Sequence, residues 1–176
     1  MRLLLCLLLC TCGLASCVDA PEYPIEPVIA FQENSKDRIL SQDLGVRDSV
    51  EIHFTFTDGD GDLSALSPTD SLDIFLIDSR AGRFTAIGRD TIVQPYSIPA
   101  IPAEGTGNGI SGSIFLDIVN TDLGICCLVQ RGPALTCSSD GRIEVDTFSY
   151  TIQIRDRAGH FSNVIRTTPI SIECVR

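Results

Sequence analysis

The sequence predicts an all-β protein whose strands form an antiparallel β-sandwich of seven to eight strands. Several short segments alternate apolar and polar residues, the period of two expected of a strand with one buried face. Turns rich in Gly, Pro, Asp and Ser separate these segments, and no segment has the apolar period of an amphipathic helix. A small β-barrel is compatible with the same pattern and is the alternative architecture.

The expected elements begin with a short strand at 28–32. The polar segment 33–48 follows, and we expect it to be a loop with a helical turn near Leu40. The alternation becomes clear over 49–57, where one face is apolar and the other polar. The apolar face carries Val50, Ile52, Phe54 and Phe56.

The remaining strands follow the same pattern. They are expected at 72–76, 84–87, 91–98, 110–118, 148–154 and 164–172. The strand at 148–154 has the strongest alternation, whereas Pro95 and Pro99 limit the strand at 91–98, because proline donates no hydrogen bond to a ladder. A long insertion at about 119–146 is included in a single domain that covers 28–176.

The first sixteen residues differ from the rest of the chain. Arg2 provides a positive start, an apolar segment at 3–9 follows, and small residues come next. An apolar segment this short is typical of an export signal and is too short for a membrane-spanning helix. The sequence from Leu14 to Cys17, Leu-Ala-Ser-Cys, resembles the lipobox of bacterial lipoproteins.

The lipobox resemblance implies that residues 1–16 are removed and that the thiol of Cys17 carries lipid. Acyl chains contribute ~0.8 kcal/mol per buried methylene, so several chains would hold the protein on a membrane. Val18 stands where an aspartate typically retains lipoproteins in the inner membrane, so the resemblance implies the outer membrane, on its periplasmic face or at the cell surface. The alternative is an ordinary secretory signal. Residues 17–27 contain three prolines and are expected to form an extended tether.

The charge balance restricts the partners. The chain has 23 acidic and 13 basic residues and a net charge of −10. Such an excess of acid argues against nucleic acid and against anionic lipid headgroups, and it suits the binding of cations. The expected partners are the membrane, through lipidated Cys17, and a protein or glycan ligand.

The turn from Asp58 to Asp62, Asp-Gly-Asp-Gly-Asp, places three carboxylates on alternate residues directly after the strand at 49–57. Hard cations such as Ca²⁺ prefer oxygen ligands of this kind. An EF-hand is excluded, because its sixth and twelfth positions would hold Leu63 and Thr69 in place of glycine and glutamate. The alternative is a solvated turn, since Asp-Gly is a common turn dipeptide.

The chain also resembles immunoglobulin-like and cadherin-like domains of bacterial surface proteins. The acidic loop at 57–63 and the turn at 155–160 carry the resemblance, although His160 stands where asparagine is usual in that turn. The antibody hallmarks, a tryptophan and a cysteine pair on the second and sixth strands, are absent. In immunoglobulin topology these two loops lie at one end of the sandwich. The resemblance therefore implies a calcium site of Asp58, Asp60, Asp62 and Asp156, with Asp19, Glu22 or Glu26 of the tether nearby.

Four cysteines remain after the export signal: Cys126, Cys127, Cys137 and Cys174. An exported chain meets an oxidising compartment, so disulfides are expected, and four cysteines allow three pairings. A bond between the adjacent cysteines would be strained, so we expect one of them to pair with Cys137 and the other with Cys174. A four-thiolate zinc site is the alternative, although the paired Cys-x-x-Cys units of such sites are missing.

No catalytic constellation is evident in the sequence. His53 lies on the polar face of a strand and His160 in a turn, and neither His-Glu-x-x-His nor Gly-x-Ser-x-Gly occurs. The glycines at 107–112 match the dinucleotide-binding string but precede a strand, so no helix N-terminus would face a phosphate. The sequence predicts that the protein is not an enzyme. It favours a binding or accessory module of the cell envelope. A structural subunit of an outer-membrane complex is the second interpretation and a hydrolase the third.

Overall fold

The computed structural model describes most of the chain between residues 22 and 174. It covers residues 22–41, 44–63, 73–80, 93–98, 101, 109–120, 125–131, 134–137 and 144–174, without the side chains of 93–95, 128–131 and 134–137. The expected signal peptide at 1–16, Cys17, Leu72 and the expected strand at 84–87 lie outside the described residues.

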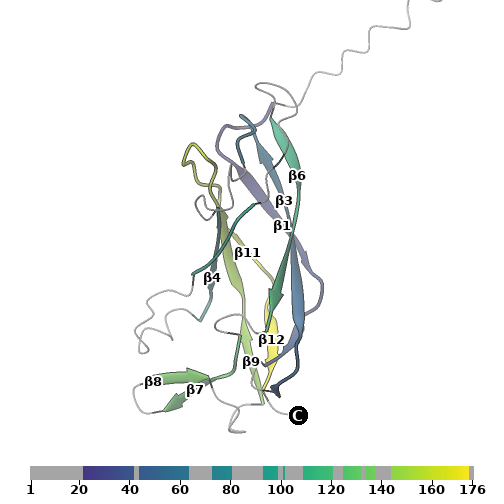
Figure 1. Cartoon of the computed structure of the whole chain (residues 1–176), viewed down its shortest axis with the longest axis vertical. Coiled ribbons are helices and arrows are strands. Elements are labelled where there is room, and N and C mark those ends of the chain that lie inside the picture. The colour runs from purple at the N-terminus through teal and green to yellow at the C-terminus, as the bar shows by residue number, and fades with distance from the viewer. Residues whose placement is uncertain are drawn as a thin grey trace, which may run out of the picture.

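The described residues form twelve β-strands and no α-helix, so the prediction of an all-β fold is confirmed (Figure 1). The strands are β1 (Val28–Asn34), β2 (Arg38–Leu40), β3 (Ser49–Asp58), β4 (Ile74–Asp78), β5 (Val93–Tyr96), β6 (Ile110–Val119), β7 (Leu128–Arg131), β8 (Ala134–Cys137), β9 (Val145–Phe148), β10 (Tyr150–Ile154), β11 (Ile165–Arg166) and β12 (Ile170–Glu173). Within this part of the chain there is accordingly no helix that is long and apolar enough to cross a membrane.

The strands form two open layers that face one another. The first layer has the order β1-β3-β6. The second is made of two sheets, β11-β10-β4-β5 and β2-β12-β9, which continue one another because only Ser149 separates β9 from β10. Buried side chains of both layers, such as Phe54 and Ile152, fill the space between them. This arrangement is the predicted sandwich.

Several of the twelve strands are pieces of longer ones. When β1 is joined to β2, β9 to β10 and β11 to β12, the sandwich has seven strands, and the hairpin β7–β8 belongs to the insertion. The β1 part of the first strand forms one layer with the second and fifth strands, and its β2 part joins the third, fourth, sixth and seventh strands in the other. This is the division of strands that the immunoglobulin fold has, with the fourth strand placed as in its variable type.

The central strand β3 confirms the alternation on which the prediction rests. Val50, Ile52, Phe54 and Phe56 are buried, whereas Glu51 on the opposite face is exposed. β3 pairs with β6 over all ten residues, from Ser49 opposite Val119 to Asp58 opposite Ile110. At about 3.3 Å per residue, this ladder separates the two ends of the sandwich by roughly 30 Å.

The expected helical turn follows Leu40 as a short 3₁₀ turn, in which the amide of Leu44 donates to the carbonyl oxygen of Ser41 at 3.1 Å, but Leu40 itself lies in a strand. Arg38–Leu40 forms β2, which pairs in parallel with β12, because Ile39 is completely buried in the core. The backbone of Leu40 is held further by Asp48, whose Oδ2 accepts a hydrogen bond of 2.9 Å from the Leu40 amide.

The expected strands at 148–154 and 164–172 are each interrupted. Phe148 and Tyr150 are both buried, as alternation predicts, but Ser149 between them is buried as well. The amide of Tyr150 donates to Oγ1 of Thr167 at 3.0 Å, so a side chain replaces a backbone partner at this point. The interruption lets β9 pair with β12 while β10 pairs with β11 and β4.

Candidate metal centre

The acidic turn begins where β3 ends. Asp58 is the last residue of β3, and Gly61 has a positive φ of 70°, which a residue with a side chain rarely adopts. Leu63 is completely buried and fixes the far end of the turn in the core. Its amide donates a hydrogen bond of 3.2 Å to Oδ2 of Asp58, so the turn folds around this carboxylate.

Asp156 follows β10, in the second layer of the sandwich. Its Oδ1 accepts a hydrogen bond of 2.7 Å from the amide of His160, and Gly159 has a positive φ of 96°. The two loops are joined directly, because the amide of Ala158 donates to Oδ2 of Asp62 at 3.0 Å. A polar connection therefore links the end of one layer to the end of the other.

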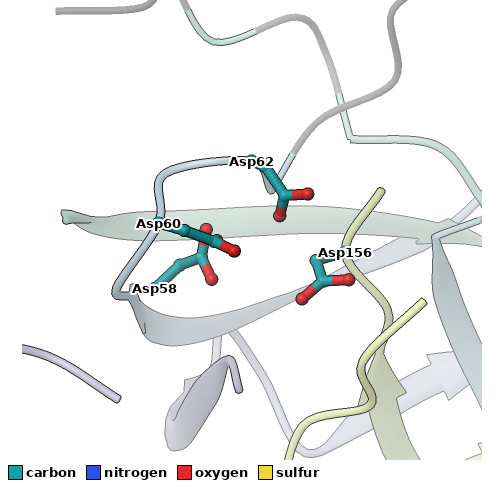
Figure 2. A group of neighbouring side chains, drawn as sticks. All are labelled: Asp58, Asp60, Asp62 and Asp156. Atoms are coloured by element: carbon teal, nitrogen blue, oxygen red, sulfur yellow. The ribbon is translucent and has the colours of Figure 1, made fainter. Parts of the chain in front are cut away.

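The four carboxylates named by the sequence lie together. One oxygen from each of Asp58, Asp60, Asp62 and Asp156 lies within 4.8 Å of the others. Figure 2 shows these carboxylates directed into the space between the acidic turn and the loop of Asp156. Asp58 and Asp156 are buried, and Asp60 is exposed.

The cluster holds unbalanced negative charge. Burial, followed by the charges of Asp60 and Asp62, raises the pKa of Asp58 to about 6. Burial, followed by the charges of Asp156 and Asp60, also raises the pKa of the Asp62 carboxyl. Each of these groups makes it harder for its neighbours to ionise, and a bound cation would relieve this repulsion.

Two carboxylate oxygens lack the partners that buried polar atoms normally have. Oδ1 of Asp58 and Oδ1 of Asp62 are buried and accept no hydrogen bond from the described residues. Asp58 as a whole is completely buried, and leaving such an oxygen without a partner costs about 1–3 kcal/mol or more for a charged group. These two unpartnered oxygens indicate a positively charged ligand.

The four oxygens are close enough for a single cation to contact all of them, because they lie within 4.8 Å of one another. Carboxylate oxygens are the ligands that hard cations such as Ca²⁺ and Mg²⁺ prefer.

His160 is a neighbour of the cluster that the sequence did not single out as part of it. Its Nδ1 lies 2.9 Å from Oδ2 of Asp156. This hydrogen bond and the charge of Asp156 raise the pKa of the imidazole and so favour its charged form beside the carboxylates. The only sequence signal was the unusual histidine where asparagine is expected.

The described part of the tether lies against the acidic turn. A Cβ built on Gly59 would lie 2.4 Å from the carbonyl oxygen of Tyr23 and 2.5 Å from that of Pro24. A Cβ on Gly109 would lie 2.8 Å from the ring of Tyr23. Glu26 is close enough for its charge to contribute to the raised pKa of His160. Asp19, the third expected tether acid, lies outside the described residues.

The cysteines lie at the other end of the sandwich. Cys127 and Cys174 form a disulfide with Cα atoms 5.6 Å apart, which is one of the predicted bonds. Cys126 is also in a disulfide. The side chain of Cys137 is not described, so its predicted bond to the other adjacent cysteine stays a prediction. Because three of the four thiols are in disulfides, the zinc alternative is wrong.

Beside the cysteines lies a buried ion cluster that the sequence did not reveal. Arg80 donates to Asp78 through Nε and a terminal nitrogen, and it donates to Asp146 at 2.9 Å. It also donates to the carbonyl oxygen of Cys126 and lies over the ring of Phe148, 4.8 Å from its centroid. Its role is therefore to hold the cysteine-bearing segment on the second layer.

Comparison of the chain with protein-family models, with curated proteins and with solved structures found no match. Function is accordingly inferred from the fold, the candidate metal centre and the N-terminal sequence.

Proposed function

We propose that this chain is a lipid-anchored, non-catalytic accessory or binding module of the bacterial outer membrane, stabilised by Ca²⁺. The observation that carries the proposal is the position of the acidic cluster. Asp58, Asp60 and Asp62 follow a strand of the first layer and Asp156 follows a strand of the second. A cation between them would tie the two layers together, which is a stabilising role.

Thermal unfolding tests the cation. A ligand at a hundred times its Kd stabilises a protein by about 2.7 kcal/mol, which corresponds to a rise in Tm of roughly 5–10 °C for a domain of this size. The rise should disappear in Asp60→Asn, which removes an exposed ligand without disturbing the core. Asp117→Asn, an exposed acid on β6, is the matched control and should keep it. A wild-type Tm that does not respond to Ca²⁺ contradicts the proposal.

Metabolic labelling with palmitate tests the anchor. Cys17→Ser should abolish incorporation of the label and move the protein from the membrane fraction to the soluble one. Cys12→Ser, which changes a cysteine inside the signal, should leave both unchanged. A wild-type chain that is exported without label would instead support the ordinary secretory signal.

Co-purification after mild crosslinking in membranes tests for a protein ligand, and recovery of the chain alone would favour a glycan ligand. The chain has three tyrosines and no tryptophan, so it offers few of the aromatic side chains on which sugars stack. A protein ligand is therefore the expected result.

One observation favours the second function, a structural subunit of an envelope complex. Among the described strands, none pairs with the outer edge of β6. Two other outer strands, β1 and β5, carry features that discourage pairing: the register of β1 shifts between Phe31 and Glu33, and β5 contains Pro95. The register of β6 is regular over its whole length. A long regular edge is a template for an added strand.

The side chains of β6 indicate what such a strand would carry. Asp117 lies directly opposite Glu51 on the exposed face, and like charges placed in this way repel. Phe115, stacked on His53 at 4.3 Å, is 58% exposed. The partner is therefore an extended segment with a lysine or arginine beside Asp117 and an apolar residue beside Phe115.

Charge reversal separates the two functions. Asp117→Lys should abolish capture of the crosslinked partner, whereas Glu33→Lys, the same change on the outer strand β1, should preserve it. Equal capture by both variants would reject β6 as the subunit interface.

A further inference from the structure

The tether and the acidic cluster are in contact, and this contact has a consequence for how the domain stands on the membrane. Gly59 is the point of contact: the three atoms nearest to an added Cβ all belong to the backbone of Tyr23 and Pro24. The backbone of Gly59 does not adopt the left-handed conformation, so the missing side chain is explained by the tether alone. The acidic turn is therefore also the surface on which the tether lies.

The charges of the tether oppose this contact when the cluster is not neutralised. Glu22 and Glu26 are exposed acids on the described tether, and the charge of Glu26 reaches His160 at the edge of the cluster. Docking the tether adds their negative charge to that of four aspartates. A divalent cation weakens this repulsion, because it offsets two of the negative charges of the cluster and attracts the same glutamates.

We propose that cation binding at Asp58, Asp60, Asp62 and Asp156 locks tether residues 22–26 against the sandwich, and that loss of the cation releases them. This inference rests on the proposed cation site. That site is supported by the completely buried carboxylate of Asp58, whose Oδ1 lacks a partner, as well as by the clustering of acids. Linkage requires the effect to be reciprocal: a docked tether raises the affinity of the site for the cation by the same factor.

The lock would set the distance between the domain and the membrane. A fully extended chain spans about 3.3–3.6 Å per residue. If the anchor is Cys17 and the whole tether is free, about ten residues reach roughly 35 Å. If residues 22–26 are docked, about five residues remain and reach roughly 17 Å. The cation would thus halve the reach of the domain.

A Glu-specific protease applied to the lipidated mature chain in detergent measures the lock, because the bond between Glu22 and Tyr23 is a cleavage site within the tether, whereas Glu26 precedes Pro27 and is resistant. With saturating Ca²⁺ the rate of cleavage after Glu22 should fall about fivefold or more, the usual lower range of coupling between two sites. The Ca²⁺ affinity of the same preparation is measured by calorimetry.

Gly59→Ala separates the tether from the cluster without removing a carboxylate. It should abolish protection of the tether by Ca²⁺ and weaken Ca²⁺ binding by about the same factor. Gly112→Ala is the matched control, because its Cβ would meet only the ring of Phe56, and it should keep both properties. Glu22→Gln combined with Glu26→Gln tests the charges by calorimetry and should also weaken binding.

The outcomes distinguish the two proposals. If the wild-type chain binds no Ca²⁺ by calorimetry or Tm, the proposed cation site fails and the lock fails with it. If Ca²⁺ binds and raises Tm but cleavage at the tether is unchanged, the lock alone is wrong. Equal Ca²⁺ affinity in wild type and Gly59→Ala would also overturn the lock.

Discussion

At the scale of single residues, Asp58 determines how the acidic cluster responds to pH. Its raised pKa means that the folded protein holds this proton at pH values where the unfolded chain, with an ordinary pKa near 3.8, has lost it. Folding therefore binds a proton between about pH 4 and pH 6, and the free energy of unfolding falls as pH rises through this window. The carboxylate that would serve a cation is a source of instability without one.

The first prediction follows from the fall in the free energy of unfolding as pH rises. Without Ca²⁺, Asp58 should reduce the stability of the wild-type protein by about 2–3 kcal/mol between pH 4 and pH 7. Asp58→Asn removes the titrating group, so this variant should lack that loss and be more stable than wild type at pH 7 in chelator. Urea unfolding at several pH values gives the difference directly. A difference that does not change with pH contradicts the assignment of Asp58.

The second prediction concerns His160. Its raised pKa keeps an imidazolium beside Asp156 at mildly acidic pH, where it competes with a cation for the same carboxylate. His160→Asn should therefore raise Ca²⁺ affinity roughly fivefold at pH 6, and the gain should shrink at alkaline pH as the imidazole loses its proton. Calorimetry at pH 6 and at an alkaline pH measures this. An equal gain at both would mean that the charge of His160 is not responsible.

At this scale the sequence identified the acids but not their environment. Asp58, Asp60 and Asp62 are visible as a motif, and Asp156 came from the resemblance to immunoglobulin-like domains. The burial of Asp58 could not be predicted, because it depends on Leu63, five residues later, entering the core. The contact between Gly59 and Tyr23 was equally hidden, since Asp-Gly alone indicates only a turn.

At the scale of elements, the buried ion cluster holds the second layer to the cysteine-bearing segment. Arg80 follows β4, Asp78 ends β4, and Asp146 lies in β9. Arg80 and Asp78 are each no more than 3% exposed. Their charges are mutually satisfied, so the cluster joins two parts of the chain that β-pairing alone does not connect.

The third prediction tests this connection. Arg80→Met should destabilise the protein by about 3–5 kcal/mol, because it leaves Asp78 and Asp146 buried without a cation. Replacing all three with apolar residues should recover much of the loss, since a buried ion pair contributes little net stability against well-packed apolar side chains. Urea unfolding measures both. Equal destabilisation by the single and triple variants would show that Arg80 acts through packing alone.

The elements predicted correctly are those in which one face is buried along the whole strand. β3 meets this condition over its whole length, and β6 meets it at Leu116 and Ile118, while the rest of its apolar face is half-buried. β2 was missed because a three-residue strand offers one buried side chain, Ile39, which forms no pattern. The division at Ser149 was missed because it depends on Thr167 supplying a partner from another part of the chain.

At the scale of the whole molecule, the proposed cation site and the disulfide lie at different ends of the sandwich. Asp58 lies at the end of the β3–β6 ladder where Ile110 begins β6, and the disulfide lies toward the opposite end. In Figure 1 the C-terminus lies at the lower end of the molecule with β7, β8, β9 and β12. The sequence predicted the disulfide to Cys174 and the grouping of the four aspartates, and the register of β3 and β6 shows that the two features are separate.

The last prediction follows from this separation. The disulfide between Cys127 and Cys174 closes a loop of 47 residues, which corresponds to about 4 kcal/mol in the chain-entropy account. Cys127→Ala with Cys174→Ala should lose about this much, and Ca²⁺ should stabilise the double variant as much as it stabilises wild type. Effects at sites more than 7–10 Å apart that share no partners usually add within about 0.3–0.5 kcal/mol. Urea unfolding of both proteins, with Ca²⁺ and with chelator, gives the coupling energy. A coupling energy larger than this would mean that the disulfide and the cation site influence one another through the β3–β6 ladder.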